Sequence, residues 1–467
     1  MFVPVGYGIM MKPFFAIAIS LVGLSTWGSH ARAELFQDGE TVCFLGDSIT
    51  ARGSLQTNVS DFYLTRFPDR TVQFVNAGRS GDTANGSLRR LQEDVIDRQP
   101  TSVVMMFGMN DIGRGYYTFK PTEAQIQSQN SALERYEASM AEVVARIRTE
   151  ANDPKLIFLT PTPYDQTAEM ETTNLFGCND GLGRCGEIVR KLAASNSAKV
   201  VDLHGPMTEL NGKQQETDPK WTIVGPDRVH PGAPGFLMMT WLFLKSQGAP
   251  AMVSKVAVDA SADRVTESVN AEVTAVKTKD GGVSFTVLAK ALPYPIDPAA
   301  KEMLALLPIE ADLNQELLSV AGLADGSYEL RIDGTAVGQH SAKELASGIN
   351  LALNQATPQF LQAQQVVKHN AQRRSAESEA ASLLNTRRWM IYHYKIDVED
   401  PAAVQAHYDH FEDKKEYSAA MARRYMEKWP NYEEIRKQVE VHWEAALASR
   451  KPVEHAYEIV PVQAAAK

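Results

Sequence analysis

Five short and almost continuous apolar runs between residues 41 and 205 constrain the fold of this chain most strongly. A strand without polar alternation is covered on both faces, which is typical of a parallel sheet. Helix-like segments separate the runs, and the clearest extends from Thr122 to Thr149 with an apolar stripe at helical spacing. This alternation predicts a doubly wound, flavodoxin-like α/β fold with a parallel five-stranded sheet and helices on both faces. The runs are TVCFL (41–45), TVQFVNAG (71–78), SVVMMFG (102–108), KLIFLTP (155–161) and KVVDLHG (199–205).

The pattern changes after residue 250. Residues 251–350 alternate between apolar and polar side chains and carry turn glycines, so we expect a smaller β-rich region of antiparallel strands. Residues 351–467 are charged and helical in pattern, and Pro401 and Pro430 are expected to separate helices. The α/β domain itself is predicted to occupy residues 34–250.

The N-terminal residues have the pattern of a targeting segment. Met11-Lys12 precedes the apolar run FFAIAISLVGLSTWG, which is followed by HARA, with small residues at Ala31 and Ala33. This order predicts a signal peptide over residues 1–33, with cleavage after Ala33 and a secreted or periplasmic protein. An N-terminal membrane anchor is the alternative, although the run is short for a bilayer span. No later stretch is long and apolar enough to predict integral membrane association.

The charge of the chain argues against nucleic acid as a partner, and the sequence does not decide whether its cysteines form a disulfide. The 467 residues carry a formal net charge of −10, which argues against a nucleic-acid partner, because phosphate binding requires clustered Lys and Arg. Cys178 and Cys185 flank NDGLGR in what we expect to be one loop, where a disulfide between them is possible. Cys43 lies within a predicted strand and is expected to be a buried thiol.

Polar residues and glycines follow the predicted strands at the edge where a doubly wound sheet places its ligands. The first strand ends at Ser48, the second at Gly78 and the third shortly before Asn110, and a later loop carries Asp227 and His230. A serine needs an adjacent base to act as a nucleophile, and a histidine needs an acid to fix its tautomer. Backbone N–H groups of Ser48 and Gly78 and the Asn110 amide are candidate donors to an oxyanion.

Four segments in this order resemble the SGNH, or GDSL, hydrolase family. They are GDSIT, NAG, GMND and DRVHPGAPG, within residues 40–245. The resemblance implies a serine esterase with Ser48 as nucleophile and Asp227 and His230 as its partners. It also implies that Gly78 and Asn110 belong to the oxyanion hole. Residues 251–467 are similar to the C-terminal extension of some secreted bacterial members, but no chemistry follows from that similarity.

Several site assignments have alternatives. Ser48 can be read as a helix N-cap, and Asn110 as a turn residue. His204 competes with His230, because Asp202 stands two residues before it and would share its face on a strand. Asp47 and Asp111 are expected to support turns. No zinc-binding spacing and no nucleotide-binding glycine motif occurs, so no metal and no cofactor is expected.

Three functions agree with these residues. The first is an exported esterase that removes acyl groups, most simply acetyl, from carbohydrates. The second is a lipolytic esterase, lysophospholipase or thioesterase with the same chemistry. The third, from a different class, is a catalytically inactive glycan-binding protein in which residues 251–467 recognise the ligand. The expected partner is therefore an acylated carbohydrate or another small ester.

Overall fold

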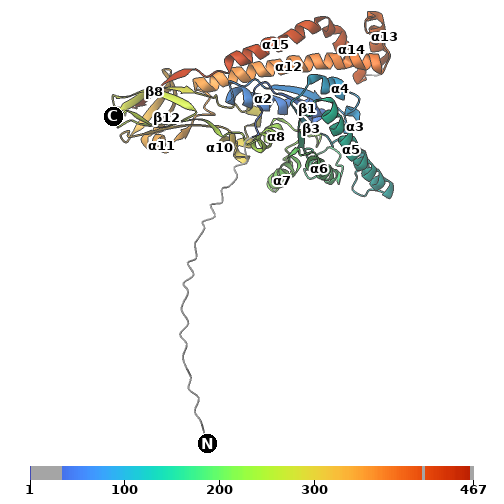
Figure 1. Cartoon of the computed structure of the whole chain (residues 1–467), viewed down its shortest axis with the longest axis horizontal. Coiled ribbons are helices and arrows are strands. Elements are labelled where there is room, and N and C mark those ends of the chain that lie inside the picture. Colours follow the sequence, from blue (N-terminus) through green and yellow to red (C-terminus); the bar gives the residue numbers. More distant parts are fainter. Residues whose placement is uncertain (2–33, 413–415, 463–467) are drawn as a thin grey trace.

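The computed structural model describes Met1, residues 34–412 and residues 416–462 (Figure 1). The predicted signal peptide, apart from Met1, and its cleavage site at Ala33 lie outside the described residues. Within the described ranges, no helix is both long and apolar enough to cross a membrane.

A five-stranded parallel sheet organises the first half of the chain, as the sequence predicts. Its strand order is β2-β1-β3-β4-β5, and every neighbouring pair is parallel. This is the flavodoxin-like order, in which the chain reverses direction across the sheet between β1 and β3. The carboxyl ends of all the strands consequently lie at one edge. The strands are β1 (Thr41–Gly46), β2 (Gln73–Gly78), β3 (Ser102–Met106), β4 (Lys155–Leu159) and β5 (Lys199–Val201).

Helices cover this sheet, with α2 packed beside α8 and α5 packed beside α6. The predicted helix from Thr122 to Thr149 is α5, and Thr122 is its N-cap in a capping box with Gln125. The helices of this part are α1 (Ser48–Ala51), α2 (Ser54–Arg66), α3 (Ala84–Ser87), α4 (Leu91–Asp94), α5 (Glu123–Glu150), α6 (Cys178–Ser195), α7 (His204–Gln215) and α8 (Ala233–Ser246), with the 3-10 turns η1 (Ile96–Arg98) and η2 (Arg114–Tyr116).

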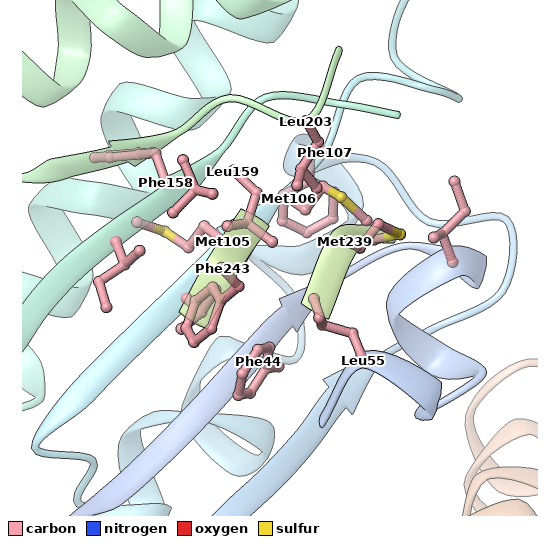
Figure 2. Packing of buried hydrophobic residues seen from close by; sticks show 14 of the residues in the cluster. Phe44, Leu55, Met105, Met106, Phe107, Phe158, Leu159, Leu203, Met239 and Phe243 are labelled. Atoms are coloured by element: carbon pink, nitrogen blue, oxygen red, sulfur yellow. The ribbon is translucent and has the colours of Figure 1, made fainter. Parts of the chain in front are cut away.

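The core of this domain lies between the sheet and its helices. Figure 2 shows Met239 and Phe243 of α8 over Phe44 and neighbouring sheet residues. The ring centroids of Phe44 and Phe243 are 5.9 Å apart, and both side chains are fully buried. Burying each such side chain stabilises the fold by about 1.5–3 kcal/mol. This apolar layer fixes α8 on the sheet and therefore fixes the loop that precedes α8.

The β-rich region is a pair of sheets with its own hydrophobic core. Most pairs are antiparallel as expected, but β6 and β10 are parallel, so one sheet is mixed. The sheet orders are β13-β10-β6-β7 and β12-β11-β14-β9-β8. The elements are β6 (Met252–Asp259), β7 (Arg264–Val269), β8 (Ala271–Lys279), β9 (Gly282–Ala289), β10 (Gln315–Ala321), β11 (Ser327–Ile332), β12 (Thr335–Ser341) and β13 (Ile349–Asn350), with η3 (Pro298–Ala300), α9 (Met303–Leu306), α10 (Ile309–Leu313) and α11 (Ala342–Ser347).

The last strand, β14 (Glu454–Pro461), was missed by the sequence analysis. It returns from the helical region and inserts between β11 and β9, antiparallel to both. Because β14 has a partner on each side, it belongs to the interior of its sheet. The β-rich region is therefore built from segments that lie on both sides of the helices in sequence.

The helices after residue 357 form a long hairpin that we call the helical arm. It comprises α12 (Pro358–Tyr392), α13 (Pro401–Glu412), α14 (Tyr417–Lys428), η4 (Trp429–Asn431) and α15 (Tyr432–Ser449). Pro401 begins α13 and Pro430 lies in η4, so both prolines separate helices as predicted. Figure 1 shows α12 and α15 side by side along the α/β domain, where α12 contacts α2. Arg388 of α12 also forms an ion pair with Glu93 at 2.7 Å.

A buried polar contact joins the helical arm to α2. The Asn370 Nδ2 donates to Asp61 Oδ1 at 2.7 Å, and Arg373 Nε donates to Asn370 Oδ1 at 3.2 Å. Asp61 is 5% exposed and Asn370 is fully buried. Burial raises the pKa of Asp61 to about 7, although Asn370 and Arg373 act in the opposite direction. The fold therefore buries a carboxyl group that is more stable when it is neutral.

We predict that Asp61→Asn stabilises the protein at pH 8, and that the gain shrinks as the pH falls towards 4. The folded-state pKa of Asp61 lies above its ordinary value of 3.8, so its contribution to stability is fully present below that value. This contribution is lost as the pH rises through about 7. Asparagine keeps the acceptor for Asn370 without a charge, and the expected gain at pH 8 is about 1–3 kcal/mol. Urea denaturation at several pH values measures it.

The matched control is Asp325→Asn, which removes a carboxylate from an exposed position. Its free energy of unfolding should follow that of the parent chain at every pH. A pH-independent effect of Asp61→Asn would contradict the burial argument.

Candidate active site

Ser48 lies in the turn between β1 and α1. Asp47 is the N-cap of α1, and its Oδ1 accepts a hydrogen bond from the Ile49 N–H at 2.9 Å. A Cβ atom at Gly46 would lie 2.6 Å from the Met106 carbonyl oxygen, so only glycine fits where β1 passes β3. The turn therefore places Ser48, the first residue of α1, at the carboxyl edge of the sheet.

His230 and Asp227 meet Ser48 at this edge. The Ser48 Oγ lies 2.7 Å from His230 Nε2 across 182 positions of sequence, and His230 Nδ1 lies 2.5 Å from Asp227 Oδ2. The N–H groups of Val229 and His230 also donate to Asp227 Oδ1, at 3.1 and 3.0 Å. Partial burial favours the neutral acid, but these hydrogen bonds outweigh it and lower the pKa of Asp227. An ionised Asp227 holds the proton on Nδ1, which leaves Nε2 to accept from the serine hydroxyl.

The loop that carries Asp227 and His230 is fastened by Arg228. Arg228 has a φ of +66° and is 2% exposed, so its side chain points into the protein between the two site residues. Its guanidinium donates to four carbonyl oxygens of the loop after β4, and no carboxylate is needed to satisfy it. The acceptors are the carbonyl oxygens of Asp165 (2.8 Å), Ala168 (3.0 Å), Met170 (3.3 Å) and Thr172 (3.1 Å).

Asn110 extends the site from the end of β3. Its Nδ2 donates one hydrogen to the Asp82 carbonyl oxygen at 2.9 Å, which leaves the second hydrogen of the amide available. Its Oδ1 accepts from Arg114 Nη2 at 3.4 Å. The amide orientation is consequently fixed from both sides.

Gly78 plays a different part from the one expected of an oxyanion donor. Its N–H donates to Asn76 Oδ1 at 2.9 Å and is therefore engaged. A Cβ atom at Gly78 would lie 2.2 Å from the Ala51 nitrogen, so the glycine allows α1 to pack against β2. In this structure Gly78 serves the packing of the turn that holds Ser48.

Gly81 offers the backbone donor that the sequence analysis assigned to Gly78. It is exposed with a φ of +75°, in the turn whose Asp82 carbonyl accepts from Asn110. Among the described residues its N–H has no acceptor, and the same holds for the N–H of Ser48. The second glycine of GRSGDT is the sequence signal for this position.

Asp47 and Asp111 support the site as turn residues. Asp111 Oδ1 accepts from the Ala84 N–H at 2.8 Å, and its Oδ2 accepts from the Gly108 N–H at 2.9 Å. Burial raises the pKa of Asp47 to about 7 and that of Asp111 to about 6, against the effect of these hydrogen bonds. Neither carboxyl group contacts His230 in the described contacts, so both have the supporting roles expected from the sequence.

The alternative pair, Asp202 and His204, does not form. β5 ends at Val201 and His204 begins α7, so the two residues do not share a strand. Asp202 binds Thr160 Oγ1 at 2.9 Å and Arg190 at 2.9 Å, while His204 Nε2 lies 3.0 Å from Asn179 Oδ1. Burial lowers the pKa of His204, as expected for a structural imidazole.

The predicted loop between Cys178 and Cys185 is wrong, because both residues lie in α6. Both thiols are free and buried, and no disulfide joins them. Seven residues of α-helix separate the two by about 10 Å along the axis, which exceeds the reach of a disulfide. Cys43 is buried within β1 as expected, and burial raises its pKa to about 12.

Metal ligands do not gather in the part of the chain that the structure describes. Within residues 34–412 and 416–462, no group of three or more His, Cys, Asp or Glu side chains is placed to hold a metal ion.

Comparison with known proteins shows similarity to known ester hydrolases over the α/β domain. Residues 44–236 match the GDSL-like Lipase/Acylhydrolase family. An acetylxylan esterase from Geobacillus stearothermophilus is 27% identical over 225 residues, which cover 45% of this chain and 94% of the esterase. A solved structure of an acetylxylan esterase from the same organism is 24% identical, covers 45% of this chain and 95% of its own, and gives a TM-score of 0.37.

A second solved structure resembles almost the whole chain. It is a gut microbial diltiazem-metabolizing enzyme, which is 27% identical with a TM-score of 0.81. The match covers 92% of this chain and 99% of that one. The family match and the acetylxylan esterase both support an enzyme that hydrolyses ester bonds. The diltiazem-metabolizing enzyme also shares the fold of the β-rich region and the helical arm, since the match covers almost the whole chain.

Proposed function

We propose that this chain is a serine esterase that works through Ser48, His230 and Asp227, since residues 44–236 match the GDSL-like Lipase/Acylhydrolase family. The observation that carries the proposal is the continuous hydrogen-bonded chain from Ser48 Oγ through the imidazole to the Asp227 carboxylate. A hydroxyl group, a base and an orienting acid in that sequence are what nucleophilic acyl transfer requires.

The first half of the proposed reaction forms an acyl-enzyme. His230 Nε2 takes the proton of Ser48 as the Oγ attacks the ester carbonyl, and Asp227 stabilises the imidazolium that results. His230 then returns the proton to the oxygen of the leaving alcohol as the ester bond breaks. In the second half, a water molecule gives a proton to His230 Nε2 as its oxygen attacks the acyl carbon. The bond between that carbon and Ser48 Oγ then breaks, and His230 returns the proton to Oγ, which restores the hydroxyl and releases the carboxylic acid.

The negative charge of the tetrahedral intermediate needs donors that are in place beforehand. The N–H of Ser48, the N–H of Gly81 and the second Nδ2 hydrogen of Asn110 fill this role in our proposal. All three come from segments that follow strands at the carboxyl edge of the sheet, and Arg114 and the Asp82 carbonyl orient Asn110. Donors that are fixed in this way cost little reorganisation when the charge develops.

Substitutions should separate the roles of these residues. We predict that Ser48→Ala and His230→Ala each lower kcat/KM for p-nitrophenyl acetate by about 10⁴-fold or more. Asn110→Ala should lower it by about 10²–10³-fold, because one oxyanion donor is lost. Steady-state kinetics measures these values, and circular dichroism checks the fold of each variant.

The matched control is His204→Gln, since His204 is the other histidine of this domain and binds Asn179. It should keep turnover within a few-fold of the parent enzyme. A fluorophosphonate probe should label Ser48, which mass spectrometry can locate. Labelling at another residue, or full activity in Ser48→Ala, would disprove the assignment.

We further propose that the substrate is an O-acetyl ester of a carbohydrate and that the enzyme is exported. An acetylxylan esterase matches this domain over 94% of its own length, and the sequence of residues 1–33 has the pattern of a signal peptide. The lipolytic alternative requires a long apolar site for the acyl chain.

Acyl-chain preference tests this proposal. We predict that kcat/KM for p-nitrophenyl acetate exceeds that for p-nitrophenyl octanoate at least tenfold, and that the enzyme releases acetate from acetylated xylan. Ser48→Ala is the control for spontaneous hydrolysis. A preference for the octanoate would favour the lipolytic alternative. Binding of polysaccharide without any ester hydrolysis would favour the inactive glycan-binding alternative.

A further inference from the structure

Two exposed aromatic rings are in contact with each other on the surface of the α/β domain. Phe119 and Phe176 are 72% and 44% exposed, and their rings meet edge to face with centroids 5.4 Å apart and an interplanar angle of 72°. We call this pair the aromatic corner. Exposing a phenylalanine forfeits about 1.5–3 kcal/mol of burial, so two such rings in contact at the surface require an explanation.

The corner is the centre of the exposed apolar surface of the α/β domain. Among the described residues from 34 to 250, every large hydrophobic side chain that is exposed comes from this neighbourhood. Tyr116 lies on the same loop as Phe119, and Ile126 is in the first turns of α5 next to it. The four residues are Tyr116, Phe119, Ile126 and Phe176. An apolar surface confined to one place in this way marks a contact site.

The corner lies at the same edge of the sheet as Ser48. Phe119 is on the loop that follows β3, which also carries Asn110, and Phe176 is on the loop that follows β4. The second loop is the one that Arg228 holds through the Thr172 carbonyl, four residues before Phe176. β3 is the neighbour of β1, and α5 packs against α6 (Figure 1). The rings therefore stand on the two loops that orient Asn110 and the Asp227–His230 loop.

Buried contacts fix the two loops that carry these rings. Tyr117 is 4% exposed and packs so closely on α6 that a Cβ atom at Gly181 would lie 2.3 Å from its hydroxyl oxygen. Gly177, the N-cap of α6, has a φ of +85° and sets the direction of Phe176 before it. Gln129 Nε2 of α5 donates to the Tyr116 carbonyl at 2.9 Å. Both loops are thus fixed before any ligand binds.

The open geometry indicates what binds there. A ligand on these rings keeps its other face in water, which suits a sugar ring with one face of C–H groups and hydroxyl groups at its rim. An acyl chain of eight carbons would leave much of its surface wet on so open a site. Lys120 Nζ lies over the Phe119 ring, 5.8 Å from its centroid, and supplies a polar donor on that side of the ring.

We propose that Phe119 and Phe176 form a stacking subsite for a sugar ring in the alcohol part of the ester, so that they select carbohydrate esters over simple ones. This inference rests on the proposed esterase function and extends it to recognition of the alcohol. The rings contact neither Ser48 nor His230 in the described contacts, so they act on binding of the substrate and not on the acyl transfer itself.

The test compares two acetyl esters of different alcohols. For Phe119→Ala and Phe176→Ala, the ratio of kcat/KM for an acetylated xylo-oligosaccharide to that for p-nitrophenyl acetate should fall about three- to tenfold, mainly through KM. Phe119→Trp, which keeps a ring, should restore the ratio. Tyr417→Ala removes an aromatic side chain that is 78% exposed on the helical arm, and it should leave the ratio unchanged.

Each result decides the inference independently of the esterase proposal. An unchanged ratio in both alanine variants, or an equal loss on both esters, would overturn the subsite. A loss on p-nitrophenyl octanoate in place of the oligosaccharide would also overturn it and identify an acyl-chain contact. If the parent enzyme hydrolyses neither acetate ester, the esterase proposal fails first. Isothermal titration of Ser48→Ala with the oligosaccharide, with and without Phe119→Ala, then still tests the subsite.

Discussion

The contact between Ser48 and His230 depends on the parallel direction of the strands in the α/β domain. When all strands run the same way, every loop that follows a strand emerges at one edge, and groups 182 positions apart in sequence come within 2.7 Å. The helices that connect parallel strands also cover both faces of the sheet, and Phe44, Met105 and Phe158 are fully buried as a result. The geometry of the site is therefore a consequence of an apolar core that contains none of the reacting groups.

The C-terminal half of the chain packs against the α/β domain through buried contacts. Arg66 of α2 is 4% exposed and donates to the carbonyl oxygens of Pro250 and Leu313. A buried cation without a carboxylate at hydrogen-bonding distance is tolerated only when such acceptors are fixed around it. Asp61, which also lies on α2, accepts a hydrogen bond from Asn370 of the helical arm. The diltiazem-metabolizing relative covers 92% of this chain, so the joined architecture recurs outside this sequence.

Sequence reasoning was most successful where one local pattern determines one element. The apolar runs located the five strands, and the apolar stripe at helical spacing located α5. It was less successful where the outcome depends on partners far along the chain. Nothing near β14 indicates that it inserts between β11 and β9, and the glycines of NDGLGR concealed a helix that packs on Tyr117. Gly78 was assigned as a donor because its residue type fits, but the Asn76 side chain that occupies its N–H is visible only in three dimensions.

In our proposal, the loop after β4 connects recognition to catalysis. Its carbonyl oxygens from Asp165 to Thr172 hold Arg228, and Phe176 precedes Gly177, the N-cap of α6. Because Arg228 stands between Asp227 and His230, the loop that carries Phe176 also holds the loop that carries the base. Both loops are fixed before the substrate binds, so stacking of a sugar ring on the aromatic corner would add binding energy without changing how His230 is aligned with Ser48. A simple ester lacks that ring, and it would therefore bind less tightly while reacting at the same preformed site.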